Sequence, residues 1–172
     1  ALSFDRVSNP LVLDFWNKNK KEILSNLSIL ENENFWKRAN INDLDIKKKH
    51  SFYISIKSLL RIELISIIKE KFKDSCVVIG NDMKSYFPDA LNSNFKHGYL
   101  KNLYDGNICL DFLAKDGDQI LYPRSIEILE NGGTLFQVES IHSQKLFEKY
   151  KDDLTFNSSD EMIEKLEFLT KH

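Results

Sequence analysis

The chain has 172 residues, of which 42% are hydrophobic and 29% are charged, and its formal net charge is −2. These values are typical of a globular chain with room for a sizeable core, and they exclude a disordered or fibrous protein. The near balance of charge gives no general reason to expect a nucleic-acid partner. No apolar run approaches the ~18 residues that a membrane span needs, and no signal peptide is recognisable.

The first part of the chain is predicted to be helical. Pro10 opens a segment with a broad apolar stripe that continues to Leu30, and a short helix is expected around Phe35 and Trp36. These aromatic residues, with Phe15 and Trp16, are expected to pack on an α/β core, the alternative being a domain outside this chain. We therefore predict an N-terminal helical extension over residues 1–49.

Residues 40–49 are polar and rich in lysine, which predicts a linker or loop. The basic run Lys47–His50 is typical of a solvated approach to a strand. The alternative is a contact with phosphates or with an anionic membrane surface, which is possible but less favoured.

From Ser51 onward, short apolar segments alternate with helical segments. Five strands are predicted, over residues 51–56, 76–80, 107–112, 134–139 and 154–157. The helices between and after them are predicted over residues 59–72, 98–106, 123–130, 142–150 and 158–172. Alternation of this kind predicts an α/β fold, a Rossmann-like, doubly wound parallel sheet of about five strands over residues 50–172. In such folds ligands bind beyond the carboxyl ends of the strands, so the loops after Ile56, Gly80, Phe112 and Glu139 are the candidates.

Several common motifs are missing from the sequence. No GxGxxG follows a strand, and there is no Walker A loop, HExxH, CxxC or GxSxG. The histidines are scattered, so no protein-bound metal site and no cofactor are predicted. Cys76 and Cys109 both lie in apolar runs, which is typical of buried reduced thiols and predicts a reducing, cytoplasmic location.

The segment PRSIEILENGG carries the strongest hint of a ligand. Pro123 suits a first helical turn and Asn131-Gly132 suits a helix end, so the helix is about two turns long. The free N–H groups at its start would attract phosphate. Glu127, one turn further on, could accept hydrogen bonds from the two hydroxyls of a ribose. The alternative is a solvated glutamate beside an ordinary helix end.

The segments YPRSIEILENGGTLFQVES and LFEKYKDDLTFNSSDEMIEKLEFL resemble the C-terminal, donor-binding half of GT-B glycosyltransferases, and the CgeB-like and glycosyl transferases group 1 families in particular. Upstream, RIELISIIKEKF with CVVIG, and FKHGYLKNLYDGNICLDF, resemble the family's arginine-bearing helix, glycine-ended strand and Gly-x-Leu turn. The resemblance covers about residues 52–171. It rests on the order of these motifs, since no single one is highly specific.

The resemblance implies a binding site for a nucleotide diphosphate sugar and no metal. Its residues would be Glu127 on the ribose, Arg61 with Arg124 and Ser125 near the diphosphate, and Gly98 with Tyr99 facing the nucleobase. From the residues alone, Arg61 could equally form an ion pair with Glu63 or Asp74, and Gly98 could serve an ordinary turn.

The function implied is donor binding for glycosyl transfer to an unknown acceptor. Family members hold the acceptor, and usually the catalytic base, on another domain, which is expected outside this chain, so the isolated chain is expected to catalyse little. Many retaining members carry a glutamate eight residues before the ribose glutamate, where this chain has Gln119. The alternative is a non-catalytic nucleotide-binding or interaction module derived from the same fold. A flavodoxin-like receiver domain is a third reading, but SIKSLL lacks the acidic cluster it needs.

Overall fold

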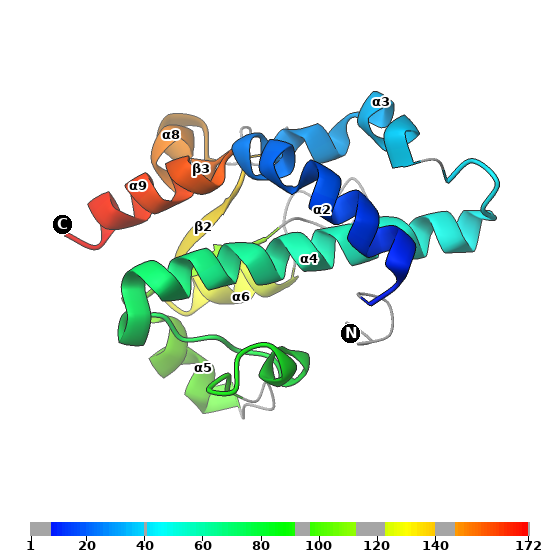
Figure 1. Cartoon of the computed structure of the whole chain (residues 1–172). Helices are drawn as coiled ribbons and strands as arrows, with labels where there is room; N and C mark the ends of the chain where they lie inside the picture. Colours follow the sequence, from blue (N-terminus) through cyan, green and yellow to red (C-terminus); the bar gives the residue numbers. More distant parts are fainter. Residues whose placement is uncertain (1–7, 40, 92–96, 113–122, 140–146, 172) are drawn as a thin grey trace. The chain divides into compact units, whose positions relative to one another are not determined.

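The computed structural model describes residues 8–39, 41–91, 97–112, 123–139 and 147–171 (Figure 1). The chain divides into two compact units, Ala1–Ser93 and Asn94–His172. The first unit is helical, and the second holds a small parallel sheet, so the expected mixed α/β class is confirmed. The predicted domain boundary at 49/50 falls inside a continuous helix of the first unit.

The first unit contains two long helices connected by short helical turns. Its elements are α2 (Pro10–Ser25), η1 (Leu27–Glu31), α3 (Glu33–Trp36), η2 (Lys37–Ala39), α4 (Ile46–Phe72), η3 (Lys73–Ser75) and η4 (Asn81–Ser85). Helix α2 begins as predicted, because the Asn9 side chain accepts a hydrogen bond from the Leu11 N–H at 2.9 Å and Pro10 follows it. Helix α2 packs against α4 (Figure 1).

An aromatic cluster joins α2 and α3 to α4. The ring centroid of Phe15 lies 5.5 Å from those of Phe35 and Phe52 and 6.0 Å from that of Trp36. The Trp36 indole N–H donates to the Leu30 carbonyl at 2.9 Å, which satisfies its one polar group. Phe15 and Trp36 therefore pack against aromatic residues of α4.

The predicted strand over residues 51–56 is wrong, because this segment belongs to α4. Its apolar residues continue a stripe at intervals of four, all buried: Phe52, Ile56, Leu60, Leu64 and Ile68. That spacing keeps one helix face against the core, and it overrides the strand preference of single β-branched and aromatic residues. The predicted linker over residues 40–49 is wrong from Ile46 onward, where α4 begins. The Asp45 side chain caps this helix by accepting a hydrogen bond from the Lys48 N–H at 2.9 Å.

The predicted strand over residues 76–80 is also wrong, since only an isolated parallel bridge joins Ile79 to Leu91. Val78 instead enters a small core with Met83, Phe87 and Ala90. Gly80 has φ +150°, which turns the chain out of an extended course. Among the described residues the sheet has three strands rather than about five, so the predicted five-stranded Rossmann sheet is not present.

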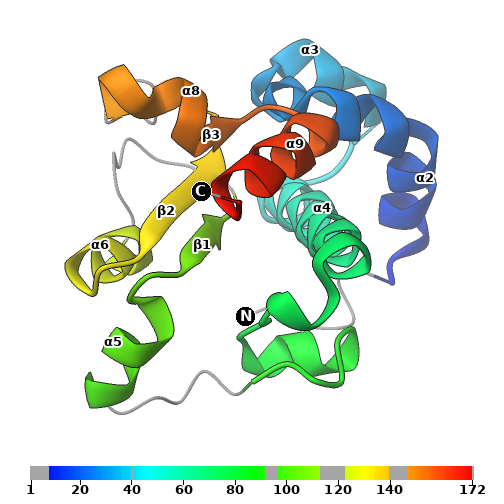
Figure 2. The ribbon, with the colours of Figure 1, turned by 90° about the vertical axis from the view of Figure 1, so that its left-hand side faces the viewer.

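The second unit alternates helices and strands as predicted. Its elements are α5 (His97–Tyr104), β1 (Ile108–Asp111), α6 (Pro123–Glu130), β2 (Thr134–Val138), η5 (Glu148–Tyr150), α8 (Lys151–Leu154), β3 (Thr155–Phe156) and α9 (Ser159–Leu169). The strands pair in parallel in the order β1-β2-β3 (Figure 2). Of the helix predicted over residues 142–150, residues 142–146 lie outside the described residues, and so does Gln119.

Both faces of β2 carry apolar packing. On one face Leu135 clusters with Ile128 of α6 and Tyr104 of α5. On the other face the rings of Phe136 and Phe156 lie 4.8 Å apart, and both residues are fully buried. Coverage on both faces explains why these strands read as continuous apolar runs instead of alternating ones.

Candidate ligand site at the carboxyl edge of the sheet

Helix α6 connects two neighbouring parallel strands. Residues Ile108 to Asp111 of β1 pair in register with Thr134 to Gln137 of β2. Because the strands are parallel, the chain must return from the carboxyl end of β1 to the amino end of β2, and α6 lies on that return. Its first turn, with Arg124 and Ser125, is therefore expected near the carboxyl edge, where ligands of α/β sheets bind, and Glu127 lies one turn further along the helix.

The side chains of α6 divide between the sheet and the surface. Ser125 and Ile128 are 1% and 2% exposed. Glu127, between them in sequence, is half-buried. Since the Ser125 side chain is buried, a contact from this residue to an anion would come from its backbone N–H. The Arg124 side chain lies outside the part of the chain that the structure describes.

The Asn-Gly-Gly segment fixes the other end of α6. Asn131 donates its side-chain amide to the Glu127 carbonyl at 2.7 Å and closes the helix. Gly132 has φ +80°, and its carbonyl accepts from the Gly106 N–H at 3.2 Å. A Cβ at Gly133 would lie 2.8 Å from Ile128 Cγ2. These residues lie before β2, at the amino edge, so their role is to dock α6 rather than to contact a ligand.

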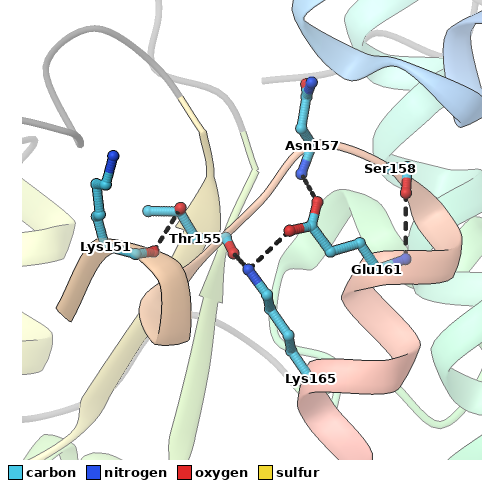
Figure 3. A network of polar contacts seen from close by, with 6 residues as sticks. All are labelled: Lys151, Thr155, Asn157, Ser158, Glu161 and Lys165. Atoms are coloured by element: carbon cyan, nitrogen blue, oxygen red, sulfur yellow. Dashed lines mark hydrogen bonds and ion pairs between the residues drawn. The ribbon is translucent and has the colours of Figure 1, made fainter.

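Beyond β3, polar side chains tie the start of α9 to the sheet (Figure 3). The Glu161 carboxylate accepts from the Asn157 N–H and pairs with the Lys165 ammonium, each at 2.7 Å. Lys165 also donates to the Thr155 carbonyl at 2.8 Å, and Ser158 caps α9 by accepting from the Glu161 N–H at 3.1 Å. Burial raises the pKa of Glu161, but the hydrogen bonds from Lys165 and Asn157 and the lysine charge outweigh it, so the net pKa is lowered.

The other predicted site residues belong to elements that precede β1 in the chain. Gly98 and Tyr99 belong to α5, a helix rather than a turn. Figure 2 shows α5 leading into the amino end of β1 and extending away from the strands. Arg61 belongs to α4 in the first unit, where Glu63, one of its expected partners, pairs with Lys20 at 2.7 Å. The role of Arg61 near a diphosphate stays a prediction.

Two residues at the edge escaped the sequence reasoning as ligand contacts, Glu139 and Asn157. Each is half-buried and immediately follows a strand, β2 and β3 respectively. The signal in the sequence was their position, because each directly follows a predicted strand at the edge where α/β sheets bind ligands. The loop after Glu139 was expected from the strand pattern, but that pattern gave no chemistry to either side chain.

The described residues offer little support for other kinds of site. No group of three or more His, Cys, Asp or Glu side chains among them is placed to hold a metal ion. None of the helices described is both long enough and apolar enough to cross a membrane. Cys76 and Cys109 are free thiols, and burial raises the pKa of Cys109 to about 11.

No family model, curated protein or solved structure matches this chain. The likeness to GT-B donor-binding domains thus stays a prediction from the order of the motifs.

Proposed function

We propose that the second unit binds a nucleotide diphosphate sugar and acts as the donor-binding half of a GT-B type glycosyltransferase. The observation that carries the proposal is the β1-α6-β2 arrangement, in which α6 lies between two paired parallel strands, so that its first turn is expected at their carboxyl edge. The diphosphate would rest on the N–H groups of this turn, and Glu127 would accept hydrogen bonds from the ribose.

The docking of α6 supports this proposal. The helix is only eight residues long, and its far end is held by Asn131 and by the close approach of Gly133 to Ile128. A short helix fixed at its end holds its first turn at a constant distance from the strands, which is what a pre-organised anion site requires. The sugar-transfer step itself would need an acceptor and a base from another domain, as in the family the motifs resemble.

A non-catalytic nucleotide-binding module is the second candidate. The observation in its favour is Gln119, which stands where many retaining family members have a glutamate. The two candidates share the nucleotide site and differ in turnover. Hydrolysis or transfer of the donor sugar, once an acceptor domain is supplied, would favour the enzyme, whereas binding without turnover would favour the module.

The proposal is tested by calorimetric titration of the full chain with UDP, GDP and their sugar conjugates. We expect Glu127→Ala to weaken the nucleotide that binds by about 30-fold, since charge-assisted hydrogen bonds contribute about 2 kcal/mol. Glu130→Ala is the matched control, because Glu130 is an exposed glutamate and the last residue of the same helix, away from the proposed phosphate site. Absence of nucleotide binding, or equal losses in both variants, would refute the proposed site.

A further inference from the structure

Glu139 and Asn157 lie next to each other on neighbouring strands. The last paired residues of β2 and β3 are Val138 and Phe156. The pairing continues one step further, because the Glu139 N–H donates to the Phe156 carbonyl at 2.7 Å. This register places Glu139 opposite Asn157 at the carboxyl edge of the sheet.

Glu139 lies on the sheet face that α6 covers. Alternate residues of a strand point to the same face, so Glu139 lies on the same side as Leu135. Leu135 packs against Ile128 of α6. Asn157 directly follows β3, so it lies beside Glu139 at the carboxyl edge of the sheet. The proposed ribose-binding Glu127 belongs to the helix that covers this face, so a ligand bound to Glu127 would lie on the same side of the sheet as Glu139.

The backbone of Asn157 is held in place independently of its side chain. Its N–H donates to the Glu161 carboxylate, which is itself paired with Lys165. Figure 3 shows the Asn157 side chain pointing away from that carboxylate. The backbone position of Asn157 is therefore fixed, which lowers the conformational entropy that a contact between this residue and a ligand would cost.

A carboxylate beside a primary amide is suited to a polyhydroxylated ligand. The Glu139 carboxylate accepts hydrogen bonds only, whereas the Asn157 amide both donates and accepts. Together they can satisfy neighbouring hydroxyl groups of a sugar ring. A nucleotide diphosphate with its ribose on Glu127 and its phosphates at the start of α6 would carry its sugar towards β2 and β3.

We propose that Glu139 and Asn157 form the subsite that holds the sugar of the donor. This inference rests on the proposed function, since it needs the nucleotide on α6. It assigns recognition of the transferred sugar, as distinct from binding of the nucleotide, to the carboxyl ends of β2 and β3.

The test compares sugar nucleotides with bare nucleotides on the full chain by calorimetry. Dissociation constants are measured for UDP and UDP-glucose, and for GDP and GDP-mannose. In Glu139→Gln and Asn157→Ala we expect the ratio of the sugar-nucleotide constant to the nucleotide constant to rise about tenfold, the effect of one lost polar contact. Glu130→Gln, at the opposite end of α6, should leave the ratio unchanged.

The outcomes separate this inference from the proposed function. If UDP or GDP binds but neither variant changes the ratio, including the case in which both constants weaken equally, the sugar subsite is refuted and the nucleotide site stands. If none of the four compounds binds the wild-type chain, the proposed function is refuted and the subsite with it. A ratio that rises in both variants and not in the control supports the subsite.

Discussion

At the scale of single residues, Gly133 shows how one missing side chain sets the position of α6. A Cβ there would meet Ile128 Cγ2 at 2.8 Å and the Tyr104 carbonyl at 3.1 Å. Both neighbours belong to packed elements, so neither can move without shifting a helix. The glycine therefore sets the closest approach of α6 to the turn before β1, and through it the height of Glu127 over the sheet.

Gly133→Ala is predicted to destabilise the fold by about 1–3 kcal/mol, the range typical of overpacking. The measurement is the midpoint of urea unfolding followed by circular dichroism. Gly106→Asn is the control, because Gly106 has φ +70° but no atom lies within 4 Å of the place that a Cβ would take, and asparagine tolerates that backbone. A Gly133→Ala variant as stable as the wild type would contradict this packing.

Cys109 gives a second prediction at this scale. Burial raises the pKa of its thiol from 9.0 to about 11, so at pH 8 the folded protein holds far less reactive thiolate than the unfolded chain. Alkylation of Cys109 in a Cys76→Ser background should be roughly ten- to a hundredfold slower in the folded than in the urea-unfolded protein. Equal rates would show that the thiol is not protected.

At the scale of elements, the contacts of Glu161 that join β3 to α9 are predicted to make the free energy of unfolding depend on pH. The pKa of Glu161 is lowered from its ordinary value of 4.5, so its ionised form favours the folded state. The stabilisation is present above pH 4.5 and is lost as the pH falls through the lower, folded-state value.

Glu161→Gln is therefore predicted to cost stability at pH 7 and to cost progressively less as the pH falls below 4.5. The measurement is the difference in unfolding free energy between wild type and variant across this range. Glu164→Gln is the control, because Glu164 is exposed on the same helix. A difference that stays constant with pH would mean that the ion pair with Lys165 contributes nothing.

These elements could be predicted from the sequence where residues close together in the chain define them. The helices from Pro10 and from Pro123 were predictable, because each start is marked by local residues. The three strands of the second unit were predictable as apolar runs. Residues 51–56 were not, since Phe52 and Ile56 fit a strand as well as a helix until the stripe through Leu60 is followed. The surroundings of Val78 were not predictable either, because its partners Met83, in η4, and Phe87, just after η4, lie in a segment with no recognisable period.

The candidate site was predictable to the same degree. The helix that carries Glu127 could be placed between two neighbouring strands from the strand-helix-strand order alone. The neighbourhood of Glu139 and Asn157 could not, because it depends on the register between β2 and β3, which no local pattern encodes.

At the scale of the whole molecule, the two units carry separate reporters. The chain has two tryptophans, Trp16 and Trp36, and both lie in the first unit, whereas Cys109 lies in the second. Tryptophan fluorescence therefore reports on unfolding of the first unit, and protection of the Cys109 thiol from alkylation reports on unfolding of the second.

A nucleotide that binds as proposed is predicted to protect Cys109. At a concentration 100 times its dissociation constant, a ligand stabilises the state that binds it by about 2.7 kcal/mol, which slows alkylation through unfolding by about 100-fold. The rate is measured in moderate urea with and without the nucleotide. Glu127→Ala should lose most of this protection at the same ligand concentration, and unchanged labelling of the wild type would count against a site on the second unit.

The hydrogen bond from Gly106 to Gly132 interlocks the two tight bends that precede β1 and β2. Lengthening either bend by even one residue would break this hydrogen bond. A protein engineer who wishes to insert residues into this scaffold would therefore avoid the bends that precede β1 and β2.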